Sequence, residues 1–262
     1  LAHELYRVTK PGGVVVWVVG DATIKGSETG TSFRQALYFK DEVGFNLHDT
    51  MVYGKNAVGA CGSKYSYQQA FEFMFILTKG KIKTFNPIKD LTPKTAGKPT
   101  RYTKNSKSTK NGYTTETHIK LAPKRSKRQN IWFYNIGFSS GDDKTEHPAV
   151  FPEQLARDHI ISWSNPGDTV LDPFAGSGTT LKMAEILQRN SIGIEISEEY
   201  CEIIKERMGN VEPAIAIGAG RGRGAGGSRG RGRGPVPPQV VLDHAGIQQL
   251  LARVQKPEDF SK

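Results

Sequence analysis

The sequence has little cysteine and no long apolar run, and each absence excludes a class of protein. Its two cysteines, Cys61 and Cys201, lie far apart, without a CxxC spacing or a Cys/His cluster. Neither a disulfide framework nor a zinc site is indicated, so we expect a reducing compartment and no metal site. The longest apolar run, Val14–Val19, is far shorter than the roughly 20 residues of a membrane helix. We therefore expect no signal peptide, no membrane span and a cytoplasmic location.

Acidic residues are scarce in one long segment. Residues 79–128 hold 12 Lys and 3 Arg against only Asp90 and Glu116, an excess that is larger than the net charge of +10. Residues 218–234 add five Arg and no acidic residue. Such concentrations of positive charge favour an anionic partner, either a nucleic acid or an anionic membrane surface.

Apolar runs alternate with helical patterns, which predicts an α/β fold with a mostly parallel sheet and helices on both faces. The predicted strands are Val14–Val19, Leu47–Tyr53, Ala70–Thr78, Thr169–Asp172 and Ile192–Glu195. Helices are predicted near residues 1–10 and 33–43, from Pro152 onward, and up to Arg189 and Met208. The chain opens inside a helical pattern and begins with Leu1 rather than Met, so we expect missing upstream residues. Val14–Val19 and Thr169–Asp172 are both expected to be central strands of one sheet.

The strongest chemical signal is a glycine-rich turn between a strand and a helix, DPFAGSGTT at residues 172–180. Glycines let the backbone approach a ligand, and the N–H groups of the following helix point at it. The turn is not a Walker A loop, and Leu181 stands where a dinucleotide fingerprint needs a third glycine. Glu195 ends the next strand, where a carboxylate can accept hydrogen bonds from both ribose hydroxyls of an adenosine-containing cofactor. The alternative is a tight turn with an incidental surface glutamate.

The motif and its surroundings resemble the permuted, β-class-like family of N4-cytosine and N6-adenine DNA methyltransferases. HPAVFPE precedes the turn at residues 147–153, and IGIE follows it at residues 192–195. LYRVTKPGG at 5–13, VVGD at 18–21 and YQQAFEFMF at 67–75 resemble segments that lie between the family's catalytic loop and its target-recognition insert. Members place the catalytic half first, then the insert, then the cofactor half. The resemblance covers roughly residues 1–210 and implies a Rossmann-like S-adenosylmethionine-dependent methyltransferase fold, incomplete at its N-terminus.

The resemblance also implies S-adenosylmethionine as the cofactor. Residues 172–180 would cradle its methionine part, with Phe174 near the adenosine and Glu195 on the ribose, and residues 147–153 would shape the other wall. The implied cofactor-binding residues are Asp172, Pro173, Phe174, Ala175, Gly176, Ser177, Gly178, Thr179, Thr180, Glu195, His147 and Phe151. An ordinary surface or capping histidine is an equal alternative for His147.

The family's catalytic signature, Asp, Asn or Ser followed by Pro-Pro and an aromatic residue, does not occur in the sequence. It is expected upstream of Leu1, before the first helix, and the only Pro-Pro pair, Pro237-Pro238, precedes Gln239. Catalytic residues therefore stay unassigned, because that loop would hold the flipped base. The leading hypothesis is a site-specific enzyme that methylates N4 of cytosine or N6 of adenine in duplex DNA, with VVWVVGD favouring cytosine. The alternatives are a catalytically inactive DNA-binding fragment or one half of a split methyltransferase, and a small-molecule methyltransferase, which the basic segment disfavours.

The basic segment is the expected target-recognition insert, because Lys and Arg neutralise phosphates and neighbouring polar residues can reach base edges. Its predicted DNA-binding residues are Lys94, Lys98, Arg101, Lys104, Lys107, Lys124, Arg125, Lys127 and Arg128. A solvated, disordered loop is the alternative. The Gly-Arg tract at 218–234 either adds sequence-independent nucleic-acid affinity or is a plain flexible linker.

Four regions follow from these patterns. Residues 1–78 are the remainder of the catalytic half, 79–130 the insert, 131–212 the cofactor half, and 213–262 a flexible tail with a short amphipathic helix. Double-stranded DNA is the expected partner, in a bacterial, archaeal or phage-infected cell. The resemblance admits a cognate restriction nuclease as a further partner and leaves the oligomeric state open.

Overall fold

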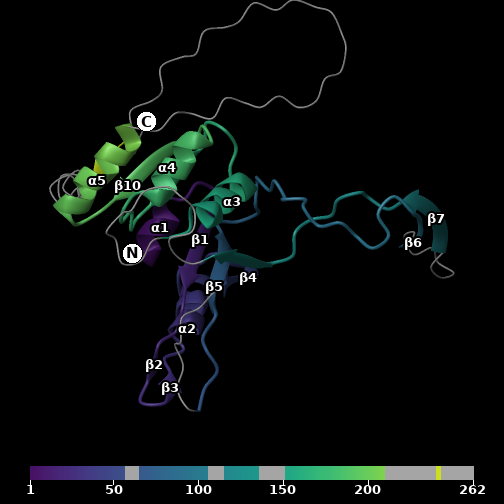
Figure 1. Cartoon of the computed structure of the whole chain (residues 1–262), viewed down its shortest axis with the longest axis horizontal. Helices are drawn as coiled ribbons and strands as arrows, with labels where there is room; N and C mark the ends of the chain where they lie inside the picture. Colours follow the sequence, from purple (N-terminus) through teal and green to yellow (C-terminus); the bar gives the residue numbers. More distant parts are fainter. Residues whose placement is uncertain (57–64, 106–114, 136–150, 210–239, 243–262) are drawn as a thin grey trace, which may run out of the picture.

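A computed structural model describes residues 1–56, 65–105, 115–135, 151–209 and 240–242 (Figure 1). The larger sheet has the strand order β1-β5-β4-β8. β1 pairs antiparallel with β5, β5 antiparallel with β4, and β4 parallel with β8. The strands are β1 (Val14–Val19), β4 (Asn46–Asn56), β5 (Phe71–Thr78) and β8 (Ile131–Asn135), and a small hairpin joins β2 (Thr23–Ile24) to β3 (Ser27–Glu28).

Helices cover both faces of this sheet, as expected. The alternation of side chains along β1 separates the two faces, because successive residues of a strand point to opposite sides. Val15, Trp17 and Val19 pack toward the cluster that holds Leu5 and Phe39. Val14, Val16 and Val18 pack toward the cluster that holds Leu155. The first face carries α1 (Ala2–Val8), α2 (Thr31–Leu37) and the π-helical turn η1 (Tyr38–Glu42), and the second carries α3 (Glu153–Trp163).

The second sheet is parallel, with the order β11-β10-β9. α4 connects β9 to β10, as the alternating pattern predicts, and α5 follows β10. The bounds are β9 (Thr169–Asp172), α4 (Thr179–Ile186), β10 (Asn190–Ile194), α5 (Glu198–Gly209) and β11 (Val240–Leu242). The tail, which was expected to be a flexible tether, thus supplies a strand. The Gly-Arg tract and the expected amphipathic helix lie outside the described residues.

The expectation that β1 and β9 are central strands of one sheet is wrong. Each lies at the end of its own sheet, and within the described residues no strand pairs with the second edge of either. Side chains join the sheets instead, because Leu171 of β9 packs against the cluster that includes Val15 and Trp17. The larger sheet is also mixed rather than mostly parallel. A buried apolar run reports burial on both faces but not the identity or direction of its neighbours.

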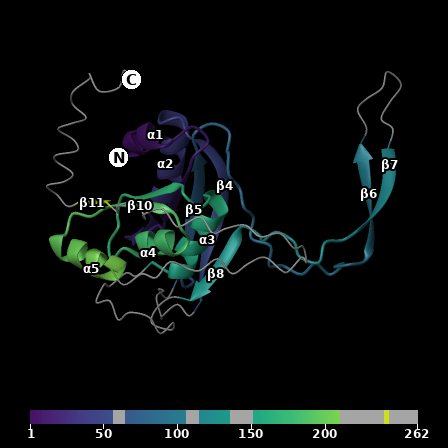
Figure 2. The ribbon, with the colours of Figure 1, turned by 90° about the horizontal axis from the view of Figure 1, so that it is seen from above.

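The basic insert contains a β-hairpin that its weak periodicity did not reveal. β6 (Pro99–Asn105) pairs antiparallel with β7 (Thr115–Leu121). Two long arms carry the hairpin away from both sheets, as Figures 1 and 2 show. The arms are tied together near the body, where the Ser126 and Arg128 N–H groups donate to the carbonyls of Leu91 and Ile88.

Candidate functional site: the β9–α4 loop and the basic insert

The glycine-rich loop leaves the carboxyl end of β9 and enters α4. Gly176 and Gly178 have positive φ angles of 51° and 82°, a conformation that side-chain-bearing residues rarely adopt. A Cβ atom at Gly178 would also lie 3.0 Å from Cγ1 of Ile204 in α5. The loop therefore needs glycine at residue 178 for both conformation and space. No side chain caps α4 at Gly178, so the first N–H groups of the helix are left for solvent or a ligand.

Glu195 joins this loop to the end of β10. Its Oε2 atom accepts a hydrogen bond of 2.8 Å from the Gly176 N–H, and its Oε1 atom accepts from Ile196 and Ser197 N–H groups at 2.9 and 3.0 Å. A carboxylate has about four acceptor positions, so about one stays open to a ligand. The sequence places Glu195 beside the loop correctly, but its bonds to the backbone were not foreseen.

An arginine of α5, with a side chain that is 9% exposed, contacts the backbone of the loop. Arg207 of α5 donates from Nη1 to the carbonyl of Ser177 at 2.7 Å, and its Nη2 atom lies 3.2 Å from Oε1 of Glu153. Lys182 of α4 also binds Glu153, at 3.0 Å. No sequence pattern assigned Arg207 a role in this site. Its contact with Ser177 spans 30 residues and has no local signature.

The β9–α4 loop carries an exposed aromatic residue that pairs with an aromatic residue of β1. Phe174 is 65% exposed, and its ring centroid lies 6.4 Å from that of Trp17 in β1. Indole Nε1 of Trp17 donates to Gln35 at 2.8 Å, which fixes the ring. Asp172 accepts from the Phe174 N–H at 3.0 Å.

The other predicted cofactor residues divide by burial. Ala175, Ser177 and Thr179 are buried, whereas Pro173 and Thr180 are half-buried. Phe151 is half-buried and packs against two clusters that include residues of α3. His147 lies outside the described residues.

The first residue of the chain is not itself a candidate catalytic group. Leu1, upstream of which the catalytic signature is expected, is exposed and is the N-cap of α1, without a side-chain capping bond. Its carbonyl accepts from the Leu5 N–H at 2.9 Å. An apolar side chain cannot accept a hydrogen bond from the amino group of a base. The catalytic residues stay unassigned in the described part of the chain, and a signature upstream of Leu1 stays a prediction.

A polar cluster lies at the carboxyl end of β1. Asp21 accepts hydrogen bonds from the backbone and hydroxyl of Ser32 and from the Thr29 hydroxyl. The Ser32 hydroxyl makes the largest contribution to holding the pKa of Asp21 below its usual value, against the opposing effect of burial. A cavity opens beside it, lined by Gly20, Asp21, Glu28, Phe33, Gln69 and Phe71, among others.

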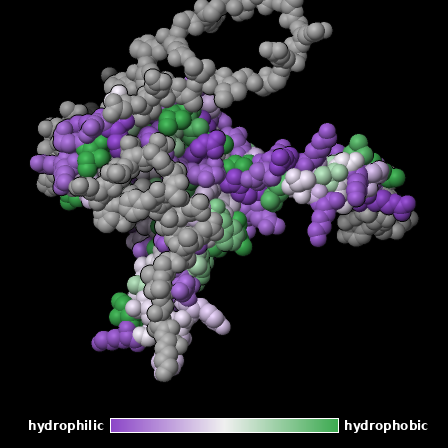
Figure 3. All heavy atoms as spheres, in the orientation of Figure 1, coloured by the Kyte–Doolittle hydropathy of each residue, from purple (hydrophilic) through white to green (hydrophobic). Residues whose placement is uncertain are grey.

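The insert presents most of its predicted DNA-binding side chains to solvent. Exposed members are Lys94, Lys98, Arg101, Lys124, Arg125 and Lys127. Figure 3 shows a largely hydrophilic surface along the arms that carry the hairpin. The backbone of Lys104 lies in β6, its side chain is not described, and Lys107 is outside the described residues. Arg125 uses one donor on the carbonyl of Asp90, at 2.7 Å.

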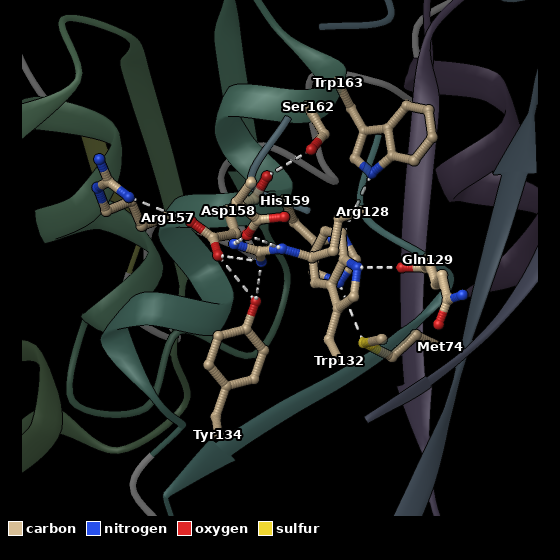
Figure 4. Close-up of polar contacts among 11 residues, drawn as sticks. Met74, Arg128, Gln129, Trp132, Tyr134, Arg157, Asp158, His159, Ser162 and Trp163 are labelled. Atoms are coloured by element: carbon tan, nitrogen blue, oxygen red, sulfur yellow. Dashed lines mark hydrogen bonds and ion pairs between the residues drawn. The ribbon is translucent and has the colours of Figure 1, made fainter. Parts of the chain in front are cut away.

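Arg128 is differently placed, because it points into the body (Figure 4). Its Nη1 atom donates to Oδ2 of Asp158 at 2.6 Å and its Nε atom to Asp90 at 2.7 Å. Asp158 is 1% exposed and also accepts from the Tyr134 hydroxyl at 2.9 Å. Burial disfavours the Arg128 charge, but hydrogen bonds from Arg128 to Asp90 and Asp158 outweigh it and raise the pKa. We therefore assign Arg128 to anchoring the insert on α3 rather than to phosphate contact.

Within the described residues, no helix is long and apolar enough to cross a membrane.

Comparison with known proteins identifies the family to which the chain is similar. A family model described as DNA methylase, of the N6/N4 methyltransferase type, matches residues 1–206. The orphan methyltransferase M.BamHII of Bacillus amyloliquefaciens is 54% identical over 214 residues, covering 80% of this chain and 79% of that protein. The type II methyltransferase M.MjaI of Methanocaldococcus jannaschii is 34% identical over 224 residues, covering 79% of this chain and 65% of that protein.

Solved structures share the fold. The complex of M1.HpyAVI with SAM has a TM-score of 0.55 at 25% identity and covers 79% of both chains. The cytosine-N4-specific PvuII DNA methyltransferase has a TM-score of 0.53 at 22% identity, covering 76% of this chain and 64% of that one. The Rossmann-like methyltransferase fold is thus confirmed. The chain belongs to the S-adenosylmethionine-dependent DNA methyltransferases of the N4-cytosine/N6-adenine family.

Proposed function

We propose that the chain binds S-adenosylmethionine at the β9–α4 loop and grips duplex DNA through its insert, for methyl transfer to N4 of cytosine or N6 of adenine. The single observation that carries the cofactor site is the bond between Glu195 and the Gly176 N–H. It holds an acceptor, an uncapped helix start and the exposed ring of Phe174 around one loop. These groups fit the ribose, the anionic methionine carboxylate and the adenine ring, respectively.

Each part of the chain has a role in this proposal. S-Adenosylmethionine, when bound, supplies a methyl group on a positively charged sulfur. The loop would orient the cofactor, and Arg207 keeps the loop in place from below through Ser177. Transfer depends on holding the amino nitrogen in line with that methyl group, so positioning is the protein's main contribution. The insert would hold the duplex from which the base is extruded.

A second candidate is one half of a split methyltransferase. One observation favours it: in the described part of the chain β1 and β9 end separate sheets, so each has an edge at which a further strand can pair. In that case a catalytic strand from another polypeptide would complete the enzyme. Methylation activity that appears only when such a polypeptide is added would establish the split form, and mass spectrometry of the DNA product would identify N4-methylcytosine or N6-methyladenine.

The cofactor assignment is tested with a matched pair of glycine variants. Gly178 and Gly167 both have positive φ, but a Cβ added at Gly178 would contact the Ile204 side chain, whereas one added at Gly167 would have open space. Both Ala variants suffer the same backbone strain, of about 1–2 kcal/mol. We expect Gly178→Ala to weaken S-adenosylmethionine binding at least about 10-fold by calorimetry, and Gly167→Ala to leave it unchanged. Equal affinities for the two variants would overturn the loop assignment.

A further inference from the structure

The β6–β7 hairpin has two chemically different faces. Its register pairs Pro99 with Leu121, Thr100 with Lys120, and Arg101 with Ile119. Because residues two apart share a face, Pro99, Arg101, Ile119 and Leu121 lie together on one face at the base of the hairpin, and we name this part of the face the apolar face. Thr100 and Lys120 lie on the opposite face, with Lys98 one step further, where its carbonyl accepts from Ala122. We name this the lysine face.

The apolar face is exposed to solvent. Ile119 is 69% exposed and Leu121 is 64% exposed. A two-stranded hairpin is marginally stable on its own in water and gains stability when one face packs on another surface. In the described part of the chain the hairpin stands apart from both sheets and all helices, as two perpendicular views show (Figures 1 and 2). Its apolar face therefore has no partner within the described residues.

Charge identifies the chemistry of that partner. Lys94, Lys98 and Lys124 are exposed near the foot of the hairpin, and Arg101 and Lys120 are exposed on it. A polyanion with an apolar component fits this combination. The major groove of DNA offers both, because phosphates line its walls and thymine methyl groups lie on its floor. It is about 12 Å wide, admits a two-stranded ribbon and exposes the thymine methyl group, whereas the minor groove is about 6 Å wide and exposes no methyl group.

We propose that the β6–β7 hairpin enters the major groove as a two-stranded ribbon, with its apolar face on the base edges and its lysine face toward solvent and the phosphate walls. This inference rests on the proposed function, since it assigns the reading of the target to one face of the insert. Arg101 binds O6 and N7 of a guanine, and Ile119 and Leu121 contact thymine methyl groups. Lys98 and Lys120 reach phosphates and carry no sequence information.

The test begins with selection of preferred duplexes by the whole chain from a library of randomised DNA. Affinities are then measured for the selected duplex, for a copy with 7-deazaguanine and for a copy with uracil in place of thymine. These replacements remove the guanine N7 acceptor and the thymine methyl group from the DNA alone, so no protein variant has to fold. We expect each to weaken binding by the unaltered chain several-fold, because a bidentate arginine contact gives about 5-fold to 150-fold discrimination.

Protein variants assign the effects to a face. Arg101→Met, which has no donor for guanine O6 or N7, is expected to abolish the response to 7-deazaguanine, and Ile119→Ala with Leu121→Ala to abolish the response to uracil. The matched control is Lys120→Gln, which alters the opposite face. It should weaken binding to selected and scrambled duplexes alike and reduce the salt dependence by about one charge.

Three outcomes contradict the ribbon assignment. One is an unchanged response to the altered bases in the apolar-face variants, and another is a change of sequence preference caused by Lys120→Gln. The third is a lack of any duplex binding, which contradicts the proposed grip on DNA as well. Duplex binding with an unaltered preference in Arg101→Met overturns the ribbon alone and leaves the proposed function standing.

Discussion

The carboxylate of Glu195 accepts more hydrogen bonds from backbone N–H groups than binding of a ribose alone requires. Three N–H groups, from Gly176, Ile196 and Ser197, hold it in place. Hydrogen bonds to a charged group contribute roughly 1.5–3 kcal/mol each. Glu195 therefore determines the shape of the loop as well as offering an acceptor to a ligand.

We expect Glu195→Gln to weaken S-adenosylmethionine binding by about 10-fold or more, because the amide offers one acceptor fewer and turns a donor toward backbone donors. Glu198→Gln, at an exposed residue in the first turn of α5, is the control and should bind normally. Calorimetry with a 2′-deoxyribose analogue separates the two roles. If Glu195 binds the ribose, the unaltered chain binds the analogue more weakly than it binds the natural cofactor, whereas Glu195→Gln binds the two with equal affinity. If both proteins lose the same affinity for the analogue, Glu195 does not bind the ribose and only its role in the shape of the loop is left.

His159 makes stability depend on pH. It is buried against the Trp132 ring, with Trp163 donating to its Nδ1 atom and Met74 Sδ 3.1 Å from Nε2. Burial lowers its pKa from 6.5 to about 3. Below pH 6.5 this histidine binds a proton in the unfolded chain but not in the folded chain. Its contribution to the free energy of unfolding is therefore fully present above pH 6.5. It falls as the pH drops toward 3, by up to about 1.4 kcal/mol per pH unit.

We expect His159→Gln to remove that slope between pH 6.5 and 3, whatever its effect on absolute stability. Urea unfolding at several pH values measures the slope, and His3→Gln, at an exposed residue, should leave it unchanged. An identical slope in His159→Gln and the unaltered chain would contradict a neutral, buried histidine.

At the scale of elements, α3 connects the two candidate sites. Its Asp158 holds Arg128 at the end of the insert, and the side chain of Asn86 donates to carbonyls at its C-terminal end, including that of Ile161. Its first residue, Glu153, binds Arg207 and Lys182 next to the β9–α4 loop. One helix thus sets the insert and the loop in a fixed relation.

We expect Arg128→Gln to lower the free energy of unfolding by about 3–5 kcal/mol, because it leaves Asp158 buried without its main cation. Arg125→Gln, at an exposed residue, should change it by less than about 0.5 kcal/mol. Urea unfolding compares the two variants. A normal stability with a reduced salt dependence of DNA binding would return Arg128 to the phosphate contacts that the sequence first suggested.

Local signals in the sequence predicted single elements well, whereas contacts distant in sequence were missed. Ser197 precedes α5 and is a residue type typical of helix N-caps, and its hydroxyl accepts from the Tyr200 N–H at 3.4 Å. The glycine turn, its helix and the strand before Glu195 are where their patterns put them. The separation of β1 from β9, the contact of Arg207 with Ser177 and the inward turn of Arg128 depend on tertiary packing. Residue type and spacing cannot report them, since each requires a partner far along the chain.

At the scale of the whole molecule, positive charge lies in two regions with different expected effects. The insert carries a folded hairpin, whereas the tract at residues 218–234 consists of arginines among glycines. We expect replacement of its five Arg by Ser to weaken binding to target and scrambled duplexes equally and to lower the salt slope. Keeping residues 240–242 preserves β11 on β10. Binding isotherms at two or more salt concentrations measure the effect, and a selective loss on target duplexes would mean that the tail reads sequence.

The separation of the hairpin from both sheets bears on how target preference can change over generations. Substitutions on the β6–β7 ribbon alter no packed core and do not touch the β9–α4 loop, so their effect on folding is small. Backbone hydrogen bonds from Ser126 to Leu91 and from Arg128 to Ile88 hold the arms in register whatever sequence lies beyond them. We therefore expect that residues 92–125 can be exchanged for the corresponding stretch of a relative. The exchange should transfer the target preference of that relative and leave the core and the β9–α4 loop unchanged.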